Sequence, residues 1–197
     1  MGKVAWGFTS SLDGFIAGPN HDMSWLTTEP PTTTDTPPAS EAASDDFTEQ
    51  MAEKVAVIIS GRAGYDAARA QADERDELTA SAYGGAWSGT EFILTHRPDE
   101  IADDPTIVAL NCSVVEAIDC AQQIAGDRDI QIISADIARQ ALEHDLIDEL
   151  QIFVAPIFLG DGTRIFEVPG GRRVHWELVD LLDGPPGSFG RIYRPRR

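Results

Sequence analysis

Hydrophobic residues along this chain gather in short runs, and polar segments with a different spacing separate the runs. The runs are rich in Val, Ile and Phe, which is typical of strands buried in a parallel sheet. The predicted strands are Val4–Ser11, Val55–Ser60, Phe92–Thr95, Thr106–Leu110, Ile130–Ile133, Leu150–Leu159, Val174–Leu182 and Phe189–Tyr193. Pro156 favours an edge strand or a bulge for the run in which it lies.

Several of the intervening segments carry helix signals. Ser113 followed by Glu116 matches a capping box, in which each side chain bonds a backbone amide of the other residue. The predicted helices are Glu41–Lys54, Gly61 to about Arg69, Ser113 to about Gly126, and Ala135–His144. Residues 71–89 have a weak pattern and are expected to form an irregular loop. Residues 27–40 are rich in Pro and Thr and predict a flexible surface loop.

The order of these elements predicts the fold class. Strands alternate with helices through most of the chain, and the last two strands follow each other directly. This order predicts an α/β fold of three layers, with a mostly parallel central sheet between helices and an antiparallel hairpin at the C-terminus. The 197 residues contain no internal repeat and no linker, so we expect a single domain over residues 1–197 that includes the 27–40 loop.

The composition is strongly acidic. The chain has 33 Asp and Glu residues against 15 Lys and Arg, which gives a net charge of -18 at pH 7, and its only lysines are Lys3 and Lys54. Such a surface repels nucleic-acid backbones and anionic lipids, so we expect neither as a partner. The excess of acid is typical of proteins from high-salt cytoplasms, and an ordinary acidic bacterial protein is the alternative.

No targeting signal is visible in the sequence. The segment 1–11 lacks the basic region and long apolar core of a signal peptide, and no apolar run is long enough for a membrane helix. Cys112 and Cys120 have neither a metal-binding spacing nor a disulfide framework, and we interpret both as structural thiols. The sequence therefore predicts a cytoplasmic protein without a metal site.

Candidate ligand-binding residues follow the predicted strands, because ligands of open α/β sheets sit beyond the carboxyl ends of parallel strands. Gly61-Arg62 opens a helix whose N-terminus suits a phosphate, although a plain strand-to-helix turn is equally compatible. Thr95-His96-Arg97 suits the 2′-phosphate of NADP or forms a simple polar loop. Ser134-Ala135 suits a pyrophosphate or is an ordinary serine cap. Asp13-Gly14 is either a functional carboxylate or common turn chemistry, and the turn is favoured.

Taken together, these segments resemble the dihydrofolate reductase-like family, in the branch similar to the C-terminal reductase domain of the bifunctional riboflavin-biosynthesis protein. Phe8–Gly18 followed by Trp25-Leu26 looks like that family's first strand and the loop over the nicotinamide. The other matching segments are Ile59–Tyr65 and Leu94–Pro98, which look like its phosphate-binding helix and adenosine-phosphate segment, and the more specific series Ile137–Leu142, Leu146–Leu150, Pro156–Gly162 and Phe166.

The resemblance implies a reductase that passes hydride from NADPH to a pyrimidine-like or pterin-like substrate. It also implies a homodimer paired through the Leu150–Leu159 strand and the C-terminal hairpin. It places substrate against Thr9, Ser11 and Trp25, with Asp13 as the candidate catalytic carboxylate. The residues that it assigns to the cofactor are Ala17, Gly61, Arg62, Gly64, Thr95, His96, Arg97, Ser134, Ala135, Asp136 and Ile137.

Two positions depart from the family pattern. Gly64 replaces a threonine, and Ser134-Ala135 replaces a Gly-Gly pair whose peptide bond is cis in typical members. A cis bond between non-proline residues costs about 2.5–4 kcal/mol, so we expect a trans bond here and a displaced cofactor held mainly by Gly61-Arg62 and Thr95–Arg97. The alternative hypothesis is a non-catalytic or repurposed binding protein on the same fold. A third hypothesis is an enzyme that uses another dinucleotide or a flavin.

Overall fold

The structure is a computed structural model that describes residues 1–26, 49–74, 82–182 and 189–196. Its main sheet has strand order β5-β4-β3-β6-β1-β7-β10-β9. These strands are β1 (Val4–Ser10), β3 (Val55–Gly61), β4 (Thr90–Leu94), β5 (Ile107–Leu110), β6 (Asp129–Ile132), β7 (Glu149–Val154), β9 (Trp176–Leu182) and β10 (Phe189–Pro195). Two further short strands, β2 (Phe15–Ala17) and β8 (Thr163–Arg164), pair with each other beside the main sheet.

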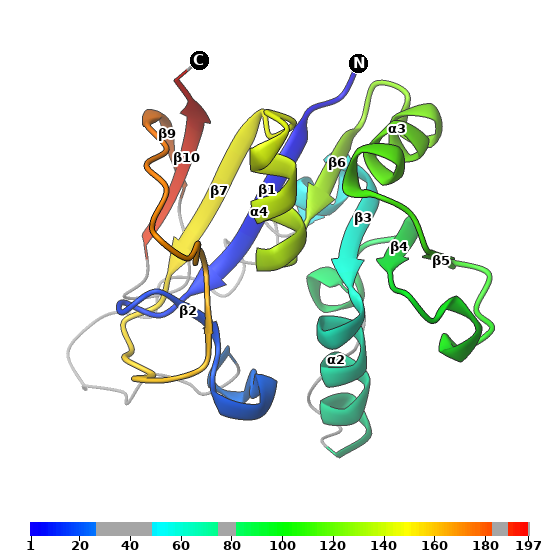
Figure 1. Ribbon diagram of the computed structural model, residues 1–197, viewed down its shortest axis with the longest axis horizontal. Helices are drawn as coiled ribbons and strands as arrows, with labels where there is room; N and C mark the ends of the chain where they lie inside the picture. The colour runs from blue at the N-terminus through cyan, green and yellow to red at the C-terminus, as the bar shows by residue number, and fades with distance from the viewer. Residues whose placement is uncertain (27–48, 75–81, 183–188, 197) are drawn as a thin grey trace.

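The strand directions match the predicted fold class. Strands β5, β4, β3, β6, β1 and β7 run parallel to one another, whereas β10 runs antiparallel to β7 and to β9. The mostly parallel sheet with an antiparallel hairpin at its C-terminal edge is therefore confirmed. Figure 1 shows β1 in the middle of the sheet, between β6 and β7, and both chain termini at the same end of the molecule.

Three helices connect the parallel strands: α2 (Arg62–Glu74), α3 (Val114–Ala125) and α4 (Ala135–Glu143). The path from β3 through α2 to β4 moves along the sheet in one direction, and the paths through α3 and α4 move in the other. Because such crossovers are right-handed, α3 and α4 lie on one face of the sheet and α2 lies on the opposite face. Figure 1 shows α4 in front of β1.

The side chains of β3 divide between these two faces. Val57 and Ile59 belong to the core cluster that contains the buried residues of α3 and α4, whereas Ile58 is fully buried outside that cluster. Alternate residues of a strand point to opposite faces, so a strand covered on both sides needs apolar residues at every position. This explains why β3 is an unbroken apolar run in the sequence.

The predicted capping box at the start of α3 is confirmed. The Ser113 hydroxyl accepts a hydrogen bond from the Glu116 amide at 3.3 Å, and the Glu116 carboxylate accepts one from the Ser113 amide at 2.9 Å. These two bonds satisfy backbone groups that the first turn of a helix leaves without partners.

Several predicted boundaries were wrong. Strand β7 ends at Val154, so Pro156 lies after it, and β7 is an interior strand between β1 and β10 rather than an edge. Helix α2 continues past Arg69 to Glu74, and residues 82–85 of the predicted irregular loop form a 3₁₀ turn. Strand β8 has only two residues and was not predicted. The 27–40 loop lies outside the described residues, as does the predicted 41–54 helix apart from residues 49–54, which are helical.

Cys112 and Cys120 are free and exposed, which differs from the buried environment that a structural thiol implies. Within the described ranges, no helix combines the length and the apolar character that crossing a membrane requires.

Candidate functional site

The carboxyl ends of β1, β3, β4 and β6 meet at one edge of the sheet. In the register of the parallel pairs, Gly61 at the end of β3 lies beside Leu94 at the end of β4, and Ile59 lies beside Ile132 near the end of β6. The segments that follow these strands, Thr95–Arg97 and Ser134-Ala135, are therefore neighbours of Gly61. Three of the sequence-predicted groups thus come together where an open α/β sheet binds its ligand.

Gly61 and Ser134 approach each other closely at this edge. A Cβ atom added to Gly61 would lie 3.2 Å from the Ser134 Oγ and 3.8 Å from Ile137. Only a glycine leaves this space open without a shift of the serine. Ile137 is buried next to this pair, and its role in cofactor binding stays a prediction.

Ser134 occupies the N-cap position of α4, but its side chain does not cap the helix. Its backbone is extended, with φ -114° and ψ 130°, and its side chain makes no capping hydrogen bond. The first amides of α4 are therefore not capped by this serine. The Ser134–Ala135 peptide is trans, as expected. A hydroxyl that makes no capping bond, at the N-terminus of a helix, is a favourable place for a phosphate oxygen.

Asp136, in the first turn of α4, accepts hydrogen bonds from Arg139 and Gln140. Its carboxylate is thereby held by groups of its own helix, and its side chain is 66% exposed. Hydrogen bonding to Asp136 raises the pKa of the Arg139 guanidinium. Asp136 is therefore a partner of α4 side chains, and its charge opposes an anion at this helix terminus.

The first turn of α2 offers more room than that of α4. A Cβ atom at Gly64 would meet no atom within 4 Å, so the missing threonine removes a hydroxyl without closing any space. Arg62, the first residue of α2, donates to Asp66 at 2.7 Å and lies 3.3 Å from Glu100. The Asp66 hydrogen bond is the largest cause that raises the pKa of Arg62.

The loop after β4 binds mainly to itself. The Thr95 hydroxyl accepts a hydrogen bond from the Arg97 amide at 3.1 Å, and the His96 ring lies 3.4 Å from the Asn111 side chain. Arg97 forms an ion pair with Glu100 at 3.1 Å. Glu100 therefore contacts both of the arginines that the sequence assigned to phosphate binding. It was not predicted, because its position depends on the tight turn that follows Arg97.

At the end of β1, Ser11 and Asp13 form a closed turn. The Ser11 hydroxyl donates to Asp13 Oδ1 at 2.5 Å and accepts from the Phe15 amide at 3.0 Å. The Asp13 carboxylate also accepts from the amides of Leu159 and Gly160, at 3.1 and 2.7 Å. The hydrogen bond from Ser11 is the largest cause that lowers the pKa of Asp13. Asp13 thus fastens the 159–160 segment to the first turn.

The other residues assigned to substrate and cofactor differ in their surroundings. Thr9 lies near the end of β1, opposite Phe153 of β7. Trp25 is 8% exposed, and its indole Nε1 is buried without a hydrogen-bond partner among the described residues. Ala17 is buried, and its carbonyl oxygen would lie 2.0 Å from a Cβ atom at Gly162. Ala17 is therefore packed against the 160–162 segment.

Two exposed apolar side chains flank the Asp13 turn, and sequence patterning did not indicate them. Phe158 is 73% exposed and Leu12 is 49% exposed. The Leu12 amide donates to the carbonyl of Ile157, which brings the two segments side by side. A flat heterocyclic ring is mostly apolar on its faces, so these side chains suit a wall of the substrate site.

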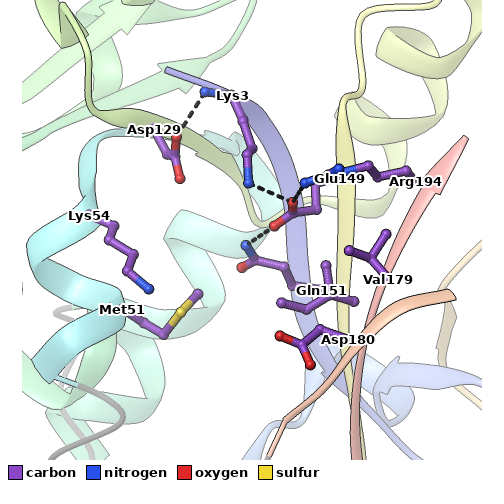
Figure 2. A pocket seen from close by; sticks show the side chains of 10 residues that line it. Lys3, Met51, Lys54, Asp129, Glu149, Gln151, Val179, Asp180 and Arg194 are labelled. Carbon is purple, nitrogen blue, oxygen red and sulfur yellow. Dashed lines mark hydrogen bonds and ion pairs between the residues drawn. The ribbon is translucent and has the colours of Figure 1, made fainter. Parts of the chain in front are cut away.

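A separate concavity lies at the opposite edge of the sheet (Figure 2). Its volume is about 170 Å³, and it is formed by the amino ends of the parallel strands together with β9 and β10. Lys3 and Arg194 lie 2.8 and 3.7 Å from the Glu149 carboxylate, which is almost fully buried, and Gln151 donates to the same carboxylate at 3.0 Å. Lys3 and Arg194 thus both pair with Glu149, which indicates a structural cluster in this part of the pocket.

The carboxyl edge fits a dinucleotide in its main features. Two helix N-termini open there, Gly61 and Gly64 leave space close to the backbone, and Ser134 has a hydroxyl with no hydrogen bond to a described side chain. These are the features that bind a pyrophosphate in α/β folds. The carboxylates Asp66, Glu100 and Asp136 are the features that oppose one.

Comparison with known proteins identifies the family and the fold of the chain. The family model of the RibD C-terminal domain matches residues 2–188. The fold is similar to a putative riboflavin biosynthesis protein from Shewanella sp. PV-4, with TM-score 0.69, 19% identity and 99% of each chain covered. It is also similar to a deaminase/5-amino-6-(5-phosphoribosylamino)uracil reductase from Thermotoga maritima, with TM-score 0.63 and 16% identity, where 99% of this chain matches 57% of that one.

A dihydrofolate reductase from Enterococcus faecalis, in a complex with NADP(H), matches with TM-score 0.59 and 15% identity over 99% of this chain and 97% of that one. The shared architecture confirms the dihydrofolate reductase-like fold that the sequence motifs implied. Together with the match of the family model over nearly the whole length, it establishes that the chain belongs to the RibD C-terminal domain family.

Proposed function

We propose that this protein is a reductase that transfers hydride from a reduced nicotinamide dinucleotide to a pyrimidine-like or pterin-like ring. The observation that carries the proposal is the meeting of Gly61 and Ser134 between two helix N-termini at the carboxyl edge of the sheet. The family and its structural neighbours are reductases, which supports the same class of reaction. The cofactor would supply the hydride itself.

In this proposal, the residues of the chain bind and orient the dinucleotide and the substrate. The amides at the start of α4 and the Ser134 hydroxyl hold the pyrophosphate, and Gly61 lets it approach the sheet. Arg62 and Arg97 lie toward the adenosine end. Thr9, Trp25 and Phe158 surround the ring that is reduced, and their apolar surfaces exclude water from the transfer.

Asp13 acts by positioning in this proposal. A carboxyl whose pKa is lowered by the Ser11 hydroxyl stays ionised at neutral pH and cannot donate the proton that completes the reduction. Its oxygens instead hold the amides of Leu159 and Gly160, which fixes the segment that carries Phe158. The proton then comes from solvent.

The test combines binding with turnover. We expect protein in molar potassium chloride to quench or shift the fluorescence of a reduced nicotinamide dinucleotide, and to consume it when an aminouracil ribose phosphate or dihydrofolate is added. The variant Asp13→Asn should keep dinucleotide binding and lose much of the turnover. A wild-type protein that binds no dinucleotide would contradict the proposal.

A repurposed binding protein is the second candidate, and a specific observation favours it. Arg62 and Arg97 are both paired with carboxylates, and Asp136 lies in the first turn of α4. A working dinucleotide site needs positive electrostatic potential at these positions. The two candidates differ in turnover. Dinucleotide binding without consumption of any of the offered heterocycles would favour the binding protein.

We also propose a homodimer formed through the C-terminal hairpin. Strand β9 is an edge of the sheet, and its side chains Leu178 and Leu181 are 51% and 61% exposed. An exposed edge with apolar side chains pairs readily with a second copy about a twofold axis. Light scattering in molar salt should give twice the monomer mass, and replacement of Leu181 by Lys should return the mass to that of a monomer.

A further inference from the structure

The arginines at the adenosine end of the proposed site share one carboxylate. Glu100 lies 3.3 Å from Arg62 and 3.1 Å from Arg97. A short 3₁₀ turn, Pro98–Glu100, places it there, because the Glu100 amide bonds the carbonyl of Arg97 and so returns the chain toward β3. The position of this carboxylate is therefore built by the backbone.

Carboxylates balance the charge of the two arginines. Arg62 also donates to Asp66, so that two cations face two carboxylates, Asp66 and Glu100. Asp99 lies on the same turn as Glu100 but forms no ion pair with either arginine. A phosphate monoester brings a charge of about -1.5 to -2 at neutral pH, and this group of charges offers it no net positive charge.

These carboxylates are favourable partners for a ribose hydroxyl. Its O–H donates to a carboxylate, and dinucleotide-binding folds use an acidic residue for the 2′-hydroxyl of NAD and a free arginine for the 2′-phosphate of NADP. Here both arginines have a carboxylate partner, and only the buried Nη1 of Arg62 has no hydrogen-bond partner among the described residues. The carboxylate that engages them is the group that a 2′-hydroxyl would bind.

We infer that Glu100 makes the site select the unphosphorylated dinucleotide, NADH, over NADPH. The inference rests on the proposed function, because it concerns the adenosine end of the same site. It revises the sequence-based prediction of NADPH, which assigned Arg62 and Arg97 to phosphate binding and did not include Glu100. The Thr95 hydroxyl accepts a hydrogen bond from the Arg97 amide, and the His96 ring lies 3.4 Å from the side chain of Asn111, which follows β5.

The experiment measures the dissociation constants of NADH and NADPH by fluorescence at one fixed salt concentration, for wild type, Glu100→Gln and Asp99→Asn. The Asp99 variant is the matched control, because it removes the same charge from the same turn without touching an arginine. We expect wild type to prefer NADH. Since Glu100 is about half exposed, its removal should shift the ratio toward NADPH by about fivefold, and by more in dilute salt.

Adenosine 2′,5′-bisphosphate and AMP, used as competitors, report the same choice without the nicotinamide. The bisphosphate should compete better against Glu100→Gln than against wild type. A wild-type preference for NADPH, or a Glu100→Gln ratio that matches that of Asp99→Asn, would overturn the role of Glu100 and leave the proposed function standing. Absence of binding by either dinucleotide in all three proteins would overturn the proposed function instead.

Discussion

Polar groups at the two ends of the central sheet differ in whether they have partners within the protein. At the amino end, Glu149 is almost fully buried and is surrounded by Lys3, Gln151 and Arg194, so its charge is satisfied within the protein (Figure 2). At the carboxyl end, the Ser134 side chain makes no capping hydrogen bond, and its hydroxyl lies close to Gly61. Groups that already have partners stabilise the fold, whereas groups left without them are available to a ligand.

The largest effect that this comparison predicts concerns the amino end. Glu149→Gln should lower the free energy of unfolding by about 2 kcal/mol, because charge-assisted hydrogen bonds in a buried place are lost. Dinucleotide binding should not change. Asp127→Asn is the control, since Asp127 pairs with the N-terminal amine at a fully exposed position, and it should cost less than about 0.5 kcal/mol in a urea titration. Equal costs in the two variants would show that the two ends do not differ as described.

The same carboxylate predicts a pH dependence. Burial raises the pKa of Glu149, but hydrogen bonds and charges from Lys3, Gln151 and Arg194 outweigh it and leave the pKa lowered. Its stabilising contribution is therefore complete above the unfolded pKa of about 4.3 and disappears as the pH falls through the lower folded value. Urea titrations at successive acid pH values should show the gap between wild type and Glu149→Gln narrowing in that range. A gap that widens on acidification would show that the pKa is raised instead.

The next effect concerns the carboxyl end. Gly61→Ala should weaken dinucleotide binding by about tenfold, a change of about 1.4 kcal/mol, because the new methyl group enters the space between Gly61 and Ser134. Stability should change little, since the Ser134 hydroxyl can rotate away. Fluorescence titration and thermal unfolding of the same preparations separate the two outcomes. Unchanged binding would place the dinucleotide elsewhere.

The smallest effect comes from Gly64, three residues further along the chain. Its Cβ would meet open space, so Gly64→Ala should raise the free energy of unfolding by about 0.5–1 kcal/mol through the better helix propensity of alanine. Binding should stay the same. A destabilised Gly64→Ala variant would mean that the first turn of α2 is more crowded than its geometry indicates.

The sequence predicted the elements of the fold better than the chemistry of the site. Buried strands such as β3 are recognisable because both of their faces are covered, and the Ser113–Glu116 cap is a local pattern. Strand β8 was missed because two residues carry no periodicity and depend on β2 for their pairing. The sequence did indicate the motifs at the strand ends, and the register of β3 with β4 and β6 brings them together.

The partners of those motifs could not be read from the sequence. Glu100 reaches Arg62 only through a turn that follows a different strand, so no spacing along the chain indicates the contact. The proposed positioning role of Asp13 has the same origin. Its carboxylate bonds amides that lie 146 and 147 positions away, which a reading of Asp13-Gly14 as a local turn cannot show.

The central place of β1 has a consequence for synthesis on the ribosome. Strand β1 pairs with β6 and β7, whose residues are translated more than 120 positions after it, as the pairing of Val4 with Ile130 shows. A nascent chain therefore carries an apolar strand without neighbours until most of the protein has been made. We expect ribosome-bound chains that stop before β6 to be sensitive to protease in β1, and chains that extend past β10 to be protected.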